Sequence, residues 1–306
     1  MEIDDASGTQ NFLKGEVLFK AAEAGDASVF NNLTEDQLLK VLSLRNEDGR
    51  SVLHVSASSG RVEVLDKLSA VDSSRTAVNG TDEEGWAPIH SAASIGNEKI
   101  VDILLSRGAD VNLKNDGGRT ALHYAASKGW VKIAEALISH GAKINLKDKV
   151  GCTPLHRAAS IGNSEICELL IEEGAEVDAE DRAGQTPLMS AVICENKEAA
   201  MLLIRHGADV DVEDKEGYTV LGRASHDFRP LLIDAAKAML EQDWHKTSEE
   251  FSLLGHFNAG RLHRVDAKRT NARHRPAQFA GNQIIAVPDS DALREKRSVE
   301  HSVVAL

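Results

Sequence analysis

The sequence of 306 residues contains few cysteines, few aromatic residues and no long apolar run. Its three cysteines, Cys152, Cys167 and Cys194, are odd in number and lack C-x-x-C spacing. This pattern argues against a disulfide framework or a zinc site and fits a reducing compartment. No run of about 18 uncharged apolar residues occurs, so no membrane span is predicted. The acidic start, residues 1–5, predicts no signal peptide. We therefore expect a cytoplasmic and nuclear protein.

Aromatic residues make up only 4% of the chain, whereas apolar residues as a whole make up 42%. Such a composition favours small, regular helix packing over a large aromatic core. The net charge of −13 lies almost entirely in residues 1–240, because acidic and basic residues nearly balance in 241–306. An acidic body repels phosphate, so it disfavours nucleic acid and favours a basic protein partner.

A short motif recurs along the chain, first after 36 residues and then every 33. Each copy has Thr, Ser or Ala three residues before His or its replacement, and Gly two residues before the motif. Thr and Ser are typical helix N-caps, and an Ala pair inside the helix allows close packing. The copies are Ser51–His54, Ala87–His90, Thr120–His123, Thr153–His156, Thr186–Met189 and Thr219–Gly222.

This repeat resembles the ankyrin repeat over about Val17–Leu240. The resemblance implies an all-α solenoid of about seven helix-turn-helix units with projecting hairpin loops. We expect an N-terminal extension over 1–16, the repeat domain over 17–240 and a mostly disordered tail over 241–306. The first and last units are atypical, which favours a monomer. Thr34–Leu42 predicts an added helix, and Pro230 predicts a last helix over Leu231–Leu240.

No phosphate-binding loop, serine-hydrolase motif or zinc-ligand spacing is present, so we expect neither catalysis nor a cofactor. The recurring histidines, His54, His90, His123 and His156, leave two interpretations open. They could bind a metal, or they could bond backbone groups between units. Their fixed place in the repeat favours the second interpretation.

The predicted hairpin tips carry acidic residues at intervals of one unit, which predicts a negative stripe along the solenoid. At Asp82, Asn115, Asp148, Asp181 and Asp214 the side chain could instead bond the loop backbone. The glutamates have no such role and indicate partner contact. The acidic candidates for partner binding are Glu47, Asp48, Asp82, Glu83, Glu84, Asp116 and Asp148.

Other candidates lie beside these tips or on the inner helices. Trp86, Arg119 and Tyr218 follow tip glycines, and Tyr124, Lys128 and Arg157 lie on predicted inner helices. For the aromatic residues, partner contact and local packing both remain open, whereas packing is favoured for Trp130. The basic run Arg261–Arg275 is interpreted as a solvated segment, with nuclear import or nucleic-acid binding as alternatives.

A closer resemblance joins three stretches: Gly85–Gly96, Leu122–Lys128 and His156–Ala159. Together they are similar to the gankyrin family, proteasome non-ATPase regulatory subunit 10. The resemblance implies an assembly chaperone that holds the C-terminal domain of one AAA ATPase subunit in its concave face. By motif match it assigns contacts to Glu83, Trp86, Tyr124, Lys128 and Arg157.

That family's L-x-C-x-E motif is broken here at Val192–Asn196, which argues against a retinoblastoma-type partner. The alternative function is a general ankyrin adaptor for a signalling or transcriptional partner.

Overall fold

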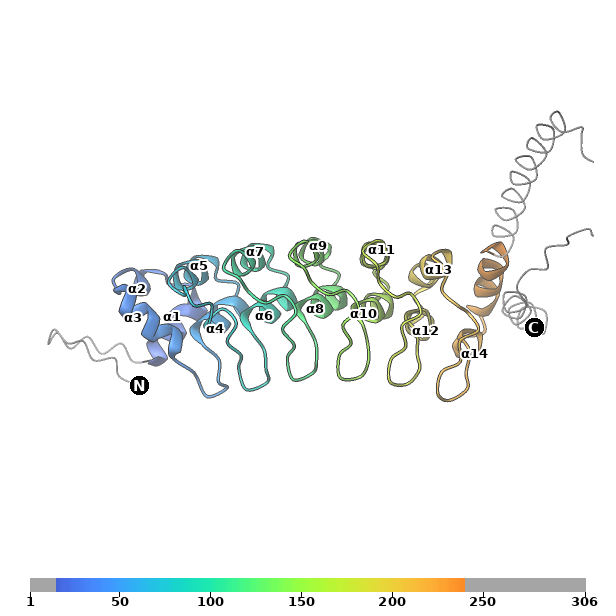
Figure 1. The fold of residues 1–306 in the computed structure, drawn as a ribbon, viewed down its shortest axis with the longest axis horizontal. Coiled ribbons are helices and arrows are strands. Elements are labelled where there is room, and N and C mark those ends of the chain that lie inside the picture. Colours follow the sequence, from blue (N-terminus) through green and yellow to red (C-terminus); the bar gives the residue numbers. More distant parts are fainter. Residues whose placement is uncertain (1–14, 240–306) are drawn as a thin grey trace, which may run out of the picture.

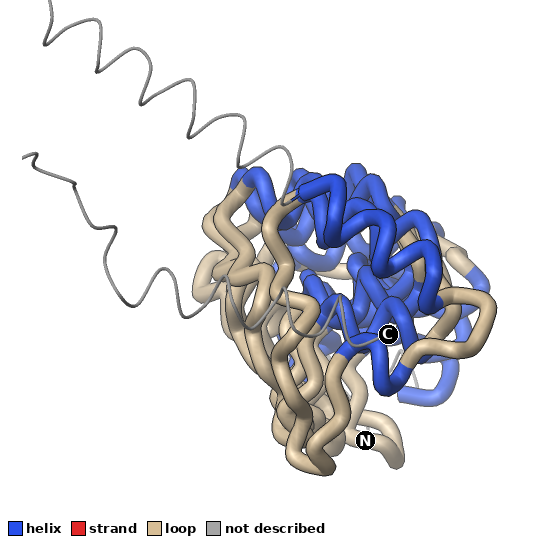
Figure 2. Tube along the Cα trace, turned by 90° about the vertical axis from the view of Figure 1, so that its right-hand side faces the viewer, coloured by secondary structure: helices blue, strands red, loops and turns tan. Residues whose placement is uncertain are grey.

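The computed structural model describes residues 15–239 as two rows of helices and one row of loops (Figures 1 and 2). The described residues contain no strand. The expected extension and tail, including the basic run, lie outside the described residues, apart from residues 15 and 16. Each unit places one helix in the inner row, and we number the units one to seven by these helices. They are α1 (Gly15–Ala24), α4 (Val52–Ser58), α6 (Pro88–Ile95), α8 (Ala121–Lys128), α10 (Pro154–Ile161), α12 (Pro187–Ile193) and α14 (Val220–Arg223).

The outer row packs behind the inner row, and its helices contact one another from unit to unit. Its members are α5 (Val62–Ala70), α7 (Glu98–Ser106), α9 (Val131–Ser139), α11 (Ser164–Glu172), α13 (Lys197–Arg205) and the helix over 229–239. Unit one instead carries two short helices, α2 (Ser28–Asn31) and α3 (Glu35–Ser43). No helix among these has the length and apolar character of a membrane span.

The predicted added helix and last helix are both confirmed. α3 begins after Thr34, whose hydroxyl accepts the backbone N–H of Gln37 while the Gln37 side chain accepts that of Thr34. This reciprocal capping fixes the helix start. The last helix begins at residue 229, so Pro230 lies in its first turn. Backbone N–H groups of the first turn have no acceptor within the helix, so the missing N–H of proline costs no hydrogen bond there. Phe228 is fully buried beneath this helix and closes the core at that end.

Inner helices begin as their sequences predict. Thr153 and Thr186 accept backbone N–H groups at their helix starts, and Pro154 and Pro187 follow at the first helical position. α6 has Ala87 at this place, which offers no hydroxyl. There the N–H of His90 donates to the Ala87 carbonyl oxygen at 3.0 Å, and Nδ1 of His90 accepts the Ala87 N–H at 2.9 Å as in the other units that have this histidine.

The recurring histidines bond backbone groups between units, which confirms the structural interpretation. Nε2 of His54 lies 2.8 Å from the Trp86 carbonyl oxygen, and that of His123 lies 3.1 Å from the carbonyl oxygen of Cys152. His90 and His156 do the same with their neighbours. Nδ1 of each ring accepts an N–H within its own unit, so both ring nitrogens are used.

The core runs the whole length of the described chain. Alanine pairs on the inner helices are fully buried, so adjacent helices approach closely. Leucines of the outer helices form a fully buried column with the period of the repeat, Leu68, Leu104, Leu137, Leu170 and Leu203. Since each unit buries its apolar face only against its neighbours, stability is a sum of intra-unit and nearest-neighbour terms.

Side-chain amides join the units behind the tips. Asn79, Asn112 and Asn145 occupy equivalent positions, and each donates Nδ2–H to a glycine carbonyl of the next unit. Each side-chain oxygen also accepts a backbone N–H from that unit. Asp178 occupies the next equivalent position and accepts the N–H of Asp209 at 3.0 Å.

Candidate protein-binding face

The tips and the inner helices behind them form one continuous surface, which we call the tip face. One backbone hydrogen bond joins each described tip to the next, for example from the Asp116 N–H to the Glu84 carbonyl oxygen at 3.0 Å. This ladder holds the tips at a regular spacing along one edge (Figure 1). The tips are residues 46–50, 82–86, 115–119, 148–152, 181–185 and 214–218.

The first Asp or Asn of each tip shapes its own loop, so the turn interpretation is confirmed. Oδ1 of Asp82 accepts the N–H of Glu84 at 3.1 Å and that of Trp86 at 2.8 Å. The first residue of every other tip also accepts N–H groups of its loop. Asp148 was expected among exposed acids, but it is only 6% exposed and pairs with Arg157.

The negative stripe is therefore not continuous. Asp148 and Asp214 are buried in ion pairs, and the tips of units five to seven also carry Lys149, Arg182 and Lys215, with Lys147 just before the first of them. Four exposed carboxylates gather instead on the tips of units two and three, at Glu47, Asp48, Glu83 and Glu84, and Arg50 is the one basic residue of these two tips. Asp116 is exposed on the following tip.

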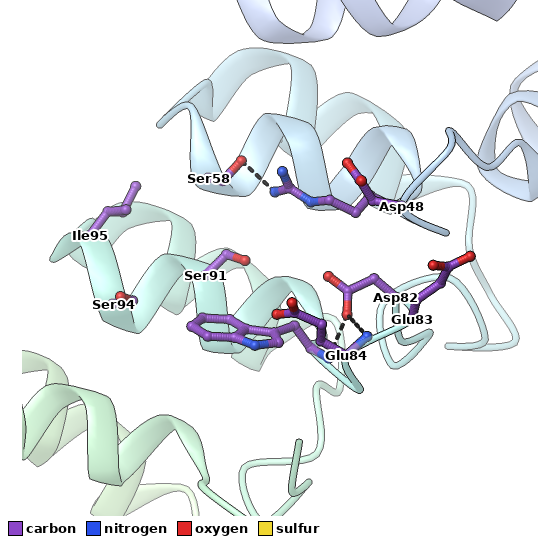
Figure 3. A pocket seen from close by; sticks show the side chains of 10 residues that line it. Asp48, Ser58, Asp82, Glu83, Glu84, Ser91, Ser94 and Ile95 are labelled. Carbon is purple, nitrogen blue, oxygen red and sulfur yellow. Dashed lines mark hydrogen bonds between the residues drawn. The ribbon is translucent and has the colours of Figure 1, made fainter. Parts of the chain in front are cut away.

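A groove of about 440 Å³ lies between the tips and inner helices of units two and three (Figure 3). Arg50 lies in it and donates to the Ser58 hydroxyl at 2.7 Å and to the His54 carbonyl oxygen at 3.2 Å. One guanidinium group thus faces four carboxylates, and the groove is strongly negative. The acidic lining is Asp48, Asp82, Glu83 and Glu84; the remaining lining is Arg50, Ser58, Trp86, Ser91, Ser94 and Ile95.

Two predicted aromatic contacts pack within the fold. The ring centroids of Trp86 and Tyr124 are 4.6 Å apart, and the Tyr124 hydroxyl accepts an N–H of Asn115 at 2.7 Å. Tyr124 is only 9% exposed, so its role is to support Trp86, which is half-buried and lines the groove. Tyr218 is 48% exposed, with Arg223 over its ring at 4.4 Å. Trp130 is 40% exposed and covers Gly96, which fits packing.

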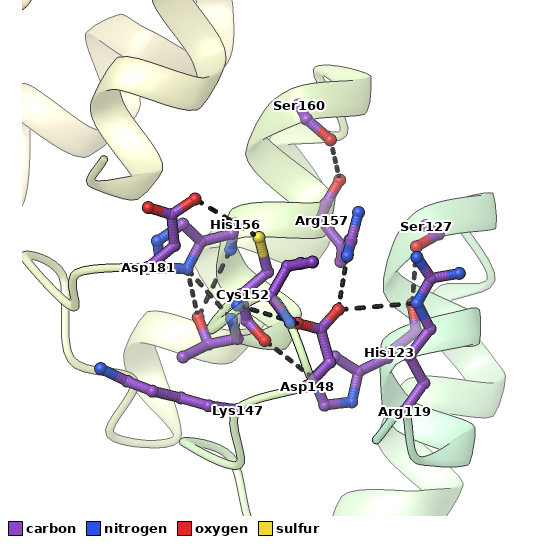
Figure 4. A network of polar contacts seen from close by, with 12 residues as sticks. Arg119, His123, Ser127, Lys147, Asp148, Cys152, His156, Arg157, Ser160 and Asp181 are labelled. Carbon is purple, nitrogen blue, oxygen red and sulfur yellow. Dashed lines mark hydrogen bonds and ion pairs between the residues drawn. The ribbon is translucent and has the colours of Figure 1, made fainter. Parts of the chain in front are cut away.

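The basic candidates lie farther along the tip face. Arg119 and Arg157 both face the carboxylate of Asp148 (Figure 4). Lys128 is exposed at the end of α8. The sequence reasoning missed a related cluster, in which Arg223 pairs with Asp214 and Glu216. The shared spacing of Asp148 to Arg157 and Asp214 to Arg223 was the signal that could have found it.

Two of the recurring histidines and two of the cysteines have strongly shifted pKa values. Burial lowers the pKa of His54 and of His123 to about 4, so both rings are neutral at pH 7. Burial also raises the pKa of Cys152 to about 11 and that of Cys167 to about 12, so these two side chains are thiols at pH 7. Residues 15–239 hold no group of three potential ligands that could bind a metal.

The fold and the tip face define a helical repeat module that binds proteins. The family model for ankyrin repeats matches the chain over residues 18–115, 108–181 and 173–249. The chain therefore belongs to the ankyrin-repeat family.

Curated relatives share the repeat but differ widely in function. The chain is 36% identical over 97 residues to 26S proteasome non-ATPase regulatory subunit 10 of Dictyostelium discoideum, covering 32% of this chain and 40% of that protein. It is 38% identical over 96 residues to calmodulin-binding transcription activator 6 of Arabidopsis thaliana, covering 30% and 11%. Alpha-latrotoxin-Lt1a of Latrodectus tredecimguttatus is 40% identical over 68 residues, covering 22% and 5%. The chain thus spans less than half of each.

Proposed function

We propose that this protein is an assembly chaperone for the proteasome regulatory particle. In this proposal the tip face binds the C-terminal domain of one AAA ATPase subunit, as a monomer, in the cytoplasm and nucleus. The observation that carries the proposal is the negative groove of units two and three. It combines four carboxylates with the half-buried ring of Trp86, and so fits a basic protein surface. The partial match to the Dictyostelium proteasome subunit supports the choice of partner.

Charge in the groove is expected to act mainly on association. Glu83 and Glu84 are exposed at the rim, and exposed charges steer a partner more than they stabilise the fold. Their carboxylates should speed encounter with a basic partner at low salt, and the effect should weaken as salt screens it.

The test is to measure binding of the full chain to the purified C-terminal domain of each proteasomal ATPase subunit. We expect tight, salt-sensitive binding to one of them. The double change Glu83→Lys and Glu84→Lys should weaken this binding about tenfold or more at low salt without unfolding the chain. The control is Glu168→Lys with Glu172→Lys, which makes the same charge change on exposed positions of α11. Equal effects of the two double changes would contradict the proposed role of the groove.

A second candidate is a general adaptor for a signalling or transcriptional protein. The observation that favours it is the similar level of identity to the plant transcription activator. A folded full chain that binds none of the ATPase domains would favour the adaptor. Identification of the proteins that co-purify with the full chain would then name the partner.

A further inference from the structure

Two arginines share one buried carboxylate on the tip face of units four and five. The side chain of Asp148 is 1% exposed, and its Oδ1 accepts the N–H groups of Val150 and Cys152 at 3.0 Å each. Its Oδ2 accepts a hydrogen bond from Arg157 and lies 3.5 Å from Nε of Arg119 (Figure 4). The loop and the arginines thus occupy both oxygens of this carboxylate.

The two guanidinium groups outnumber the one carboxylate that contacts them. Burial acts to raise the pKa of Asp148, but the hydrogen bond and charge of Arg157 and the two loop N–H groups lower it below its ordinary value. The carboxylate is therefore ionised at neutral pH and compensates one of the two guanidinium groups. Lys147 and Lys149, on either side of Asp148, add positive charge, and Asp116 on the tip of Arg119 adds negative charge. Asp181 of the next tip is engaged by the N–H groups of its own loop.

The two guanidinium groups also have donors to spare. Nε of Arg157 is buried and closed to a partner, but the side chain as a whole is 23% exposed. The Arg119 side chain is 41% exposed and, within residues 15–239, approaches Asp148 as an ion pair without a hydrogen bond. An arginine carries five N–H donors in a planar fork that matches a carboxylate. We propose that Arg119 and Arg157 together bind the side-chain carboxylate of an aspartate or glutamate on a protein partner.

In a related cluster in unit seven, the charge of one arginine is compensated by two carboxylates. There Arg223 pairs with two carboxylates, those of Asp214 at 2.5 Å and Glu216 at 2.7 Å. Its guanidinium also lies over the ring of Tyr218. This arginine is fully compensated within its own unit, so the excess at Arg119 and Arg157 is not a general property of the repeat.

The place of the pair on the fold indicates a protein as the occupant. Arg119 and Arg157 are partly exposed on the open tip face, where a carboxylate is best held by a partner that also binds elsewhere. The negative groove lies on the same face, nearer the N-terminus. A partner that offers a basic group to the groove and an acidic group to the arginines can bind in only one direction. This orientation rests on the proposal that the tip face binds a protein.

The test uses the full chain and a tetraglutamate peptide with acetyl and amide caps, which has only side-chain carboxylates. At low salt we expect the peptide to shift the NMR resonances of the Nε–H groups of Arg119 and Arg157, and to leave that of Arg223 in place. Arg119→Gln should weaken peptide binding at least fivefold. Arg182→Gln, which makes the same charge change on an exposed tip position, should leave it nearly unchanged. Capped tetraglutamine is the uncharged control and should not bind.

The proposal is overturned if the glutamate peptide causes no shift at Arg119 and Arg157, or if Arg119→Gln and Arg182→Gln have equal effects. The same two variants, tested against the ATPase domains, separate this inference from the proposed function. If one domain binds both variants equally, the arginine site is contradicted while the chaperone proposal stands. If no domain binds but Arg119 is required for the peptide, the site stands and the chaperone proposal fails.

Discussion

Among single residues, Asp178 shows how one side-chain atom changes the hydrogen bonds between two units. The asparagines at equivalent positions in the three preceding units both accept an N–H and donate to a glycine carbonyl. The carboxylate of Asp178 accepts the N–H of Asp209 but has no donor for the carbonyl of Gly207. Burial raises the pKa of Asp178, and the charge of Asp209 adds to this effect. An ionised carboxylate is therefore less favourable at this position than the amide of an asparagine.

Asp178→Asn should stabilise the protein by about 1 kcal/mol, because it adds one interunit hydrogen bond and removes a half-buried charge. The reverse change one unit earlier, Asn145→Asp, should destabilise it by a similar amount. Urea unfolding of both variants at pH 7 measures the two effects. A loss of stability in Asp178→Asn would show that the missing donor is not the limiting feature.

The buried histidines should make stability depend on pH. The pKa of His123 is about 4 in the folded chain and about 6.5 when unfolded, so the unfolded state binds the proton more tightly. Stability is therefore full above pH 6.5 and falls as the pH decreases from 6.5 towards 4. Between pH 7 and pH 5 this one residue should account for about 2 kcal/mol.

Comparison of variants by urea unfolding at these two pH values checks the histidine prediction. His123→Gln should be less stable than the parent at pH 7, with a smaller loss between pH 7 and pH 5. The exposed His206→Gln is the control. If the parent and His123→Gln lost equal stability on acidification, the buried ring would not be the titrating group.

The sequence predicted the role of these histidines because the repeat itself fixes their surroundings. It predicted the Asp148 side chain less well. The spacing placed this residue on a tip, but only the folded chain shows that Arg157, nine positions later, reaches back to it. The pairing depends on how the tip folds back onto the inner helix of its own unit, and the repeated nine-residue spacing of Asp148 to Arg157 and Asp214 to Arg223 was its only local sign.

Among the helices and loops, two glycines that follow helices differ in their surroundings: Gly96 follows α6, and Gly174 follows α11. Gly96 has φ 81°, and a Cβ at this position would lie 2.4 Å from Cε2 of Trp130 in the next unit. Gly174 has φ 89°, and a Cβ there would meet nothing within 4 Å. Both positions strain an ordinary residue, but only Gly96 also meets a packed ring.

Gly174→Ala should therefore destabilise the chain by about 1 kcal/mol, the cost of left-handed backbone. Gly96→Ala should destabilise it by about 1–3 kcal/mol more, because the new methyl group collides with the ring. Thermal or urea unfolding of the two variants measures the difference. Trp130→Ala should recover part of the loss when combined with Gly96→Ala; absence of any recovery would contradict the collision.

The starts of the helices were largely predictable, as α3 and the helix over 229–239 show. Caps and prolines act within a few residues, so the sequence displays them directly. The stacking of Trp86 on Tyr124 was not predictable in this way. It joins two units, and the sequence left partner contact and local packing both open for these rings.

Over residues 15–239 the core is spread evenly along the units, so damage to an end unit should remain local. Phe228→Ala removes a fully buried ring from the last unit, and Leu137→Ala removes a fully buried side chain from unit four. Both changes cost about 3–5 kcal/mol by the usual cost of core truncation. Because units contact only their neighbours, Phe228→Ala should loosen 210–239 and leave units three to five protected.

Hydrogen exchange followed by mass spectrometry distinguishes these patterns. Leu137→Ala should raise exchange on both sides of unit four. A uniform increase across the chain in Phe228→Ala would mean that the units unfold together. The repeat count followed from the sequence alone, whereas the distribution of charge did not, since burial removes Asp148 and Asp214 from the exposed set.

The ladder of single hydrogen bonds between tips has a mechanical consequence. The ladder fixes spacing along the tip edge, while the units behind it meet through apolar side chains and through the asparagine and histidine hydrogen bonds to the next unit. The protein is therefore built as a strip in which each unit is tied to the next at several points. Small tilts add from unit to unit, so the two ends move much farther than any adjacent pair. A rigid partner that spans several tips sets the curvature of the strip, and the energy of bending is shared among all the units it crosses.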